Sequence, residues 1–284
     1  MKNLQNFGKI FALSLMTVFV SCESEDVGTE VETVEAELKV TPALRAKLDA
    51  LALNSSVVEP YTTTYPDGST FEGFKIGGDI LLTENEINTM SIYADEGGIT
   101  SEQYRTNNLV SQPRTLTVIG YTGGQFALSS RGRTGLRRAV NNYNALNLGI
   151  SFSLRFAQST NADIVVFDNS VNNPGGAGGS AGFPSGGNPN RFVQIFGLNG
   201  FSNDVNEHVV THEIGHSIGF RHTDFFSRQS CGDNINEGDG GVGAIQIPGT
   251  PAGFDPNSIM LACFNSGVNG EFNANDRTAL RFLY

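Results

Sequence analysis

The sequence predicts an α+β fold in which two long helices back a twisted, mixed five-stranded sheet, followed by a loop-rich half with a C-terminal helix. Short apolar or alternating runs predict four strands, near residues 115–119, 150–157, 162–167 and 191–196, and a fifth strand is expected near 179–183. Apolar residues at helical spacing predict long helices at 134–148 and 205–218 and a last helix at 273–283. Residues 230–249 between them are rich in Gly, Asp and Asn, as loops are.

The order of these elements predicts how they connect. A strand, a helix and a second strand in succession imply a right-handed parallel pair. The Gly- and Pro-rich stretch 172–190 is either a flexible loop or, as we favour, a rim segment with an edge strand near 179–183. An open sheet edge can pair with an extended peptide. We expect Asn203 or Asp204 to cap the second long helix, and Asn273 or Asn275 to cap the last one.

The first residues are typical of an export signal. Lys2 and Lys9 precede an apolar run at 10–20, which is too short to span a bilayer. The following Ser21-Cys22 resembles a bacterial lipobox, which implies that residues 1–21 are a signal peptide and that Cys22 carries lipid; the alternative is a cut elsewhere by ordinary signal peptidase. We therefore expect an exported lipoprotein of the bacterial outer membrane or cell surface, or a form released from it.

The charge of the chain excludes some partners. The chain carries 18 basic and 29 acidic residues, a net charge of −11. Removing Lys2 and Lys9 leaves 18 − 2 = 16 basic residues, so the exported form carries 16 − 29 = −13. Such a surface repels nucleic acid and offers no polybasic membrane patch. Residues 22–40 are an acidic tether, the lipid is the only expected membrane contact, and we expect a monomer.

A metal-binding pattern dominates the second long helix. Residues 212–222 read H-E-x-x-H-x-x-G-x-x-H. His212 and His216 lie one helical turn, about 6 Å, apart on one face. Gly219 allows the chain to turn, so that His222 becomes a third ligand of one Zn²⁺, and the open fourth position is typical of catalytic zinc. Glu213 is placed to take a proton from a water molecule at that position.

The four histidines also allow other interpretations than a catalytic zinc site. Incidental histidines on an ordinary amphipathic helix are disfavoured, because all four histidines of the chain lie between residues 208 and 222. His208 lies about 12 Å of helix rise from His216, too far to share one metal, so we expect a structural or solvent-facing residue. A surface lipoprotein with a structural zinc and no turnover remains the second functional hypothesis.

The zinc pattern and a downstream Ser258-Ile259-Met260 resemble the metzincin metallopeptidases, with their extended zinc motif and Met-turn. The first five residues of the zinc pattern, His-Glu-Ile-Gly-His, resemble more narrowly the zinc motif of the bacterial dual-action HEIGH metallopeptidases. The resemblance covers about residues 112–284 and implies a peptidase that acts on proteins or peptides in a cleft between a sheet subdomain and a loop-rich one. It implies that Met260 underlies the metal. Thr223 and Asp224 after the third histidine are not common family markers, and no Tyr follows Met260 closely.

Residues 41–111 are then expected to be a pro-segment and linker, ahead of a zinc peptidase domain at 112–284. A helix is predicted at 42–53, strands near 70–76 and 79–82, and a helix at 83–93. The stretch Gly77-Gly78-Asp79-Ile80-Leu81-Leu82 resembles the pro-peptide motif of astacin-type proteases, whose Asp takes the water position on zinc. Asp79 is the candidate latency residue; the alternative is an ordinary turn Asp at a strand start.

Two further sites concern the loop-rich half. If Cys22 carries lipid, Cys231 and Cys263 remain as an even pair in an oxidising compartment, so we predict a disulfide between them, with two buried free thiols as the alternative. Four oxygen-bearing residues could hold Ca²⁺, although their spacing matches no defined loop. They are Asp233, Asn234, Glu237 and Asp239.

Overall fold

The predicted mixed five-stranded sheet is present in a computed structural model, which describes residues 38–51, 53–90, 103–234, 245–250 and 254–284. Its strand order is β6-β5-β7-β9-β8. The strands are β5 (Arg114–Tyr121), β6 (Ile150–Ala157), β7 (Ile164–Asp168), β8 (Gly178–Ser180) and β9 (Phe192–Phe196). β5, β6, β7 and β9 are parallel, and β8 pairs antiparallel with β9 as the predicted edge strand. The signal peptide, most of the tether and Cys22 lie outside the described residues.

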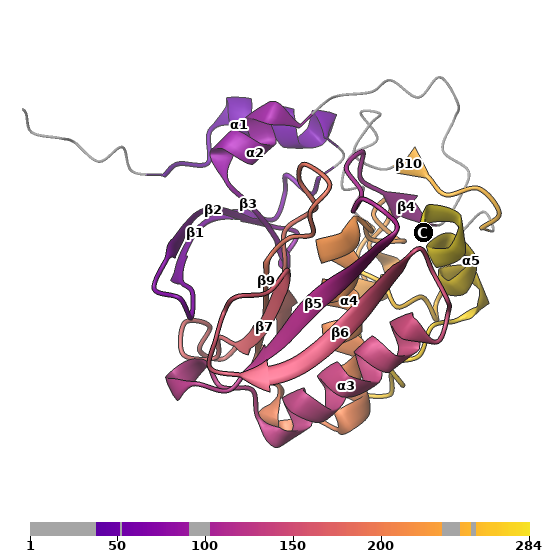
Figure 1. Cartoon of the computed structure of the whole chain (residues 1–284). Coiled ribbons are helices and arrows are strands. Elements are labelled where there is room, and N and C mark those ends of the chain that lie inside the picture. Colours follow the sequence, from indigo (N-terminus) through magenta and orange to yellow (C-terminus); the bar gives the residue numbers. More distant parts are fainter. Residues whose placement is uncertain (1–37, 52, 91–102, 235–244, 251–253) are drawn as a thin grey trace, which may run out of the picture. The chain divides into compact units, whose positions relative to one another are not determined.

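Two long helices pack against one face of this sheet (Figure 1). α3 (Ser130–Asn144) connects the parallel strands β5 and β6, as the strand–helix–strand pattern predicts. α4 (Asn203–Ile218) packs against α3, β8 and β9. Every residue of α4 from Val205 to Ile218 is buried, so this helix is enclosed on all sides. None of the helices in the described part of the chain is long and apolar enough to cross a bilayer.

One helix cap differs from the expectation. The cap of α4 is Ser202, whose hydroxyl accepts a hydrogen bond from the Val205 N–H at 3.2 Å, and not Asn203 or Asp204. Ser202 has the extended backbone that a cap requires, whereas the two expected residues already lie in the first helical turn. α5 (Ala274–Leu283) begins after Asn273, one of the two expected caps.

The N-terminal elements form a second, smaller layer. They are α1 (Pro42–Ala50), β1 (Val58–Thr64), β2 (Thr70–Ile76), β3 (Ile80–Leu82) and α2 (Glu84–Thr89). The strands form an antiparallel sheet in the order β1-β2-β3, of which β1 was not predicted. This layer has a core of its own, including Leu48, Phe74 and Ile76, to which Phe183 from the second half of the chain contributes. The domain boundaries predicted above stay predictions.

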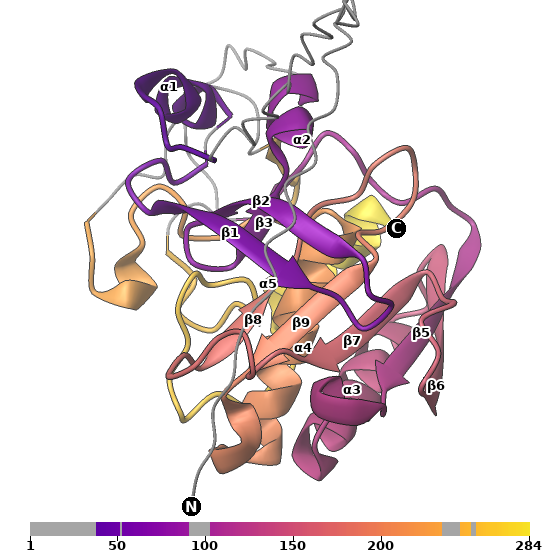
Figure 2. The same ribbon diagram turned by 90° about the vertical axis from the view of Figure 1, so that its left-hand side faces the viewer.

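The β1–β2 hairpin covers the sheet face opposite the long helices (Figure 2). The Tyr65 ring stacks on Phe192 at 4.0 Å between centroids and meets Phe167 edge-on at 5.9 Å. Phe167 alternates with Val166, which belongs to the core on the helix side, so the phenylalanine points the other way. β7 is therefore buried on both faces, whereas β5 and β6 keep exposed residues on the outer face, at Thr115, Thr117, Ser153 and Arg155.

β3 lies along the edge strand of the large sheet. The Leu81 N–H donates to the Ala181 carbonyl at 2.9 Å, and the Ala181 N–H donates to the Asp79 carbonyl at 2.9 Å. Ile80 and Ala181 form a parallel bridge. The expected peptide-binding edge is thus paired with a segment of the same chain.

Residues 103–111, expected to be linker, pair with the second half of the chain. β4 (Tyr104–Arg105) forms an antiparallel ladder with β10 (Ile245–Gln246). The Arg221 N–H donates to the Tyr104 carbonyl at 2.8 Å, next to the third histidine of the zinc pattern. Three 3₁₀ turns complete the described elements, at Gly124–Phe126, Leu198–Gly200 and Gln229–Cys231.

Candidate metal centre

Three histidines converge at the end of α4. His212 and His216 are one turn apart, with ring centroids 4.6 Å from each other. Gly219 ends the helix in the left-handed conformation, at φ 113°, which a side chain would disfavour. The chain then turns back, so that the His222 ring lies 5.4 Å from His212 and 4.9 Å from His216.

Backbone carbonyls orient two of these rings. His212 Nδ1 lies 2.8 Å from the Ile259 carbonyl, and His216 Nδ1 lies 2.8 Å from the Phe220 carbonyl. These contacts assign the proton to Nδ1 and leave each Nε2 as an acceptor for a metal. His216 Nε2 is buried and has no hydrogen-bond partner among the described residues. A buried acceptor without a partner is costly, which favours a cation at this point.

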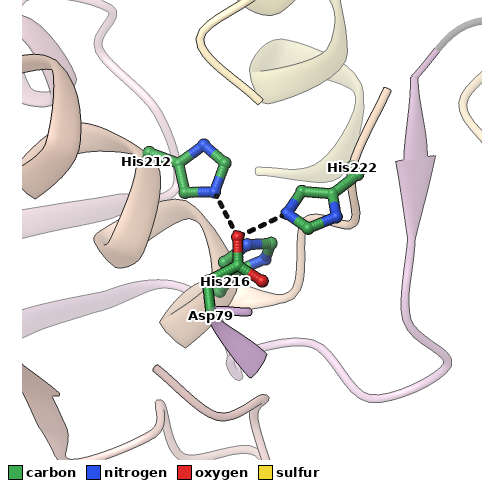
Figure 3. A group of neighbouring side chains, drawn as sticks. All are labelled: Asp79, His212, His216 and His222. Carbon is green, nitrogen blue, oxygen red and sulfur yellow. Dashed lines mark hydrogen bonds and ion pairs between the residues drawn. The ribbon is translucent and has the colours of Figure 1, made fainter. Parts of the chain in front are cut away.

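Asp79 completes the group, as Figure 3 shows. Its Oδ2 lies 2.8 Å from His222 Nε2 and 3.6 Å from His212 Nε2. One donor atom from each of the four residues lies within 4.8 Å of all the others. Tetrahedral zinc with bonds of about 2.1 Å places its donors roughly 3.4 Å apart, so this buried set of three nitrogens and one oxygen fits the ion.

The charges around Asp79 favour its carboxylate form. Burial raises its pKa, but the charge of His222 and hydrogen bonds with His212 and His222 outweigh burial and hold the pKa well below its usual range. Asp79 is nevertheless nearly inaccessible, with 9 % of its surface exposed. An ionised carboxylate this deep is stable only because cationic or donor groups surround it.

Glu213 follows the first histidine and lies beside the same group. Burial, and next the negative charge of Asp79, raise the pKa of Glu213 well above its usual range, while His222 and Lys75 oppose the shift. Its Oε2 is buried and has no hydrogen-bond partner in the described residues. The side chain packs against the edge strand, because a methyl group added to Gly179 would lie 2.5 Å from Glu213 Cγ. A carboxyl group with a raised pKa at a metal site can take up and return a proton.

Met260 lies beneath the helix that carries the histidines. A side-chain carbon added to Gly215 would lie 2.5 Å from Met260 Sδ, so any larger residue here would displace the Met260 side chain. Asp276 of α5 holds the turn in place, accepting hydrogen bonds from the Ser258 hydroxyl at 2.8 Å and the Ile259 N–H at 3.1 Å. The carbonyl of Ile259 in turn orients His212.

The predicted disulfide between Cys231 and Cys263 is present. Asp224 joins the same two segments from the other side. Its carboxylate accepts hydrogen bonds from the Ser230 N–H and from the Ala262 N–H, each at 2.9 Å. From the sequence, Asp224 was noted only as an uncommon residue after the third histidine; its buried linking role depends on contacts 38 residues apart.

His208 was expected to be structural or to face solvent. It is buried, and so it has the structural role. It is 5 % exposed, its ring lies 5.7 Å from Phe264, and it is not one of the four metal-site residues. Burial, with a smaller contribution from His212, lowers its pKa to about 3.

This low pKa predicts that His208 makes the protein less stable in mild acid. Below an unfolded pKa of about 6.5 the unfolded chain gains a proton that the folded chain does not, which costs up to about 1.4 kcal/mol per pH unit. Between pH 7.5 and pH 5 the wild type should therefore lose about 2 kcal/mol more stability than His208→Gln. Urea unfolding of both proteins in EDTA at the two pH values measures this. Equal losses would show that His208 protonates in the folded protein.

Of the four expected calcium ligands, Asp233 and Asn234 lie in the described residues. The group of His, Cys, Asp and Glu donors found there is Asp79 with the three histidines, and it does not include Asp233. Glu237 and Asp239 lie outside the described residues. The calcium site stays a prediction.

A cavity of about 530 Å³ opens beside the metal site. Four residues of α4 line it, namely His208, Val209, His212 and Glu213. The segment after Met260 and the start of β8 form its walls, and the Gly77-Gly78-Asp79 turn closes one side. The cavity is therefore bounded partly by the N-terminal layer.

Comparison with known proteins finds one matching family and two similar solved structures. Residues 74–284 match the family described as dual-action HEIGH metallopeptidases. Two solved structures of myroilysin resemble the chain at 16 % identity, with TM-scores of 0.39 and 0.37. The matches cover 61 % and 70 % of this chain and 81 % and 95 % of those chains. A comparison with curated proteins finds no match.

Proposed function

The chain belongs to the dual-action HEIGH metallopeptidase family, a family that implies zinc and a protein or peptide substrate, and on that premise we propose that it is a zinc endopeptidase of the metzincin type made as a latent precursor. The observation that carries the proposal is the buried group of three histidines with Glu213 next to it, beside a sheet edge that already holds an extended segment.

Each residue then has a role. His212, His216 and His222 hold zinc through ring nitrogens, two of which are oriented by the carbonyls of Ile259 and Phe220. When bound, zinc acidifies a water molecule and polarises the carbonyl of the scissile bond. Glu213 accepts a proton from the attacking water and returns it to the leaving nitrogen, a role suited to its raised pKa. Met260 packs beneath Gly215 and fixes the helix.

Latency is assigned to Asp79 and its strand. The carboxylate of Asp79 lies where a fourth zinc ligand belongs, and β3 occupies the sheet edge on which we expect an extended substrate to lie. The N-terminal layer therefore blocks both the metal and the substrate path. Full activation requires that Asp79 leave the histidines and that β3 leave Ala181.

Zinc content and casein cleavage test the proposal directly. The full chain is expected to bind one zinc and to be nearly silent toward casein. Limited trypsin treatment, which opens the N-terminal layer, should produce cleavage that EDTA abolishes and zinc restores. The trypsin is quenched before each assay. The proposal would be overturned if the treated chain holds zinc but cuts neither casein nor a peptide library.

A second candidate function has one observation in its favour. With Asp79 the metal site has four protein ligands, which is typical of structural zinc. A surface lipoprotein that binds a ligand without turnover would need only this closed site. It would not need Glu213, a buried carboxyl group whose Oε2 has no partner among the described residues. Retained folding with no activity in any Asp79 variant would favour this candidate.

Export and anchoring complete the proposal. The basic start, the short apolar run and Cys22 support an exported lipoprotein with residues 23–40 as a tether. In that environment the Cys231–Cys263 disulfide would persist, and it joins the loop after the zinc pattern to the segment after Met260. Labelling with a fatty-acid analogue, compared with Cys22→Ala, tests the anchor.

A further inference from the structure

Arg228 is a cation held rigidly in the wall of the cavity beside the metal site. It adopts the left-handed conformation, at φ 47°, which is uncommon for a residue other than glycine. Its backbone N–H donates to the Asp224 carbonyl at 2.7 Å, and its Nη2 lies 3.4 Å from Cys231 Sγ of the disulfide. Only 6 % of its surface is exposed. The unusual backbone and these contacts fix where the guanidinium lies.

The guanidinium contacts the segment that blocks the metal. Nη2 donates to the Gly77 carbonyl at 3.2 Å, two residues before Asp79. Gly77 has no side chain, but a Cβ built on it would lie 3.4 Å from Arg228 Nη1 and 3.8 Å from Asp79 Oδ1. Gly77 itself is left-handed, at φ 65°, so a peptide residue in this place would adopt another backbone, but it would still lie beside the guanidinium and next to the metal site.

The charge of the cavity also favours an acid at this place. Arg228 is the one Lys or Arg among the described residues that line the cavity. Once Asp79 has left with the N-terminal layer, Glu213 is the one carboxylate that remains among the described residues of the lining. A guanidinium binds a carboxylate through two parallel hydrogen bonds, which are stronger than those between neutral groups.

We propose that Arg228 is a substrate-binding residue that selects peptides with an Asp or Glu within two residues of the scissile bond, on the side where Gly77 now lies. In the latent chain the Gly77 carbonyl occupies the guanidinium. In the open enzyme the carboxylate of the substrate replaces it. This inference rests on the proposed peptidase function and names a substrate class for it.

A peptide library tests the proposal on the zinc-loaded wild-type and Asp79→Ala chains, each after limited trypsin treatment. Mass spectrometry of the products, with the trypsin quenched, gives a cleavage profile. Peptides with Asp or Glu at one position near the cut should have kcat/KM about tenfold above the Asn or Gln counterparts, the effect of one charge-assisted contact. Arg228→Gln should remove this preference, and Arg228→Glu should shift it toward Lys and Arg. Arg137→Gln, at an exposed arginine of α3, is the matched control.

The possible outcomes distinguish the role of Arg228 from the peptidase function. A wild-type profile without acidic preference, or a preference unchanged in Arg228→Gln, would overturn the role of Arg228 and leave the peptidase function standing. No cleavage by any form would overturn the peptidase function and this inference with it. Arg228→Lys keeps the positive charge and should keep part of the preference, which covers the case in which Arg228→Gln does not fold. Zinc content and thermal melting report folding for each variant.

Discussion

Replacing Asp79 with alanine in the full chain is expected to raise peptidase activity at least about tenfold, because the substitution removes the carboxylate that competes for the fourth position on zinc. Asp79 Oδ2 lies 2.8 Å from His222 Nε2, so no water fits between them. The three histidines remain, and zinc content should stay at one per chain. Casein cleavage by the purified, untreated variant measures the effect.

The rest of the N-terminal layer sets the size of this increase. In Asp79→Ala the hydrogen bonds between β3 and Ala181 persist, as does the stack of Tyr65 on Phe192. We therefore expect trypsin treatment to raise the activity of the variant further, toward that of the treated wild type. Asp79→Asn should behave in the same way, because a neutral amide is a weak zinc ligand.

A matched control separates the metal contact from a general loosening of the layer. Asp49 is an exposed acid on α1 of the same layer, and Asp49→Ala should remain silent. If Asp79→Ala binds zinc, folds and is as silent as Asp49→Ala, while the treated wild type is active, then the strand rather than the carboxylate maintains latency. Equal activation of both variants would point to loosening of the layer.

Replacing Glu213 with glutamine is expected to reduce turnover by about 10³-fold, the usual contribution of general acid–base catalysis, with little change in zinc content. Glutamine keeps the shape of the side chain but cannot accept the proton from the attacking water. The comparison is made in the Asp79→Ala chain after trypsin treatment, where neither the carboxylate nor β3 blocks the site, by kcat/KM on one fluorogenic peptide. The loss should appear in kcat more than in KM, because the carboxylate acts in the transition state.

Stability gives an independent check on Glu213. Its carboxyl group is buried, and its Oε2 has no partner among the described residues, so neutral glutamine should leave the free energy of unfolding unchanged or raise it. Glu213→Asp places the same group one methylene further from its target and should retain partial activity. The proposed mechanism is falsified if Glu213→Gln cuts the peptide at the rate of its parent.

Local patterns explain what could be predicted. The i, i+4 spacing of His212 and His216, and the glycine at which their helix ends, are properties of one segment and its dihedral angles. Apolar or alternating runs likewise indicated the strands of the large sheet, except for the edge strand near Gly179, which was expected within a Gly- and Pro-rich rim segment. The short-range rule for caps located Asn273 but missed Ser202, since three consecutive polar residues offer equal signals.

Sequence by itself thus determined the zinc-binding helix, the individual strands of the large sheet and the residue types for metal chemistry, because each depends on neighbours within a few positions. Only the tertiary structure decided that Asp79 meets His222 across 143 residues, that Arg228 holds Gly77 across 151, and that β4 pairs with β10. Such contacts depend on how separate elements pack, and a single sequence carries no periodic signal for them. The same packing buries Asp79 and Glu213, which raises the pKa of each, and it places the histidines whose charge and hydrogen bonds bring the pKa of Asp79 down again.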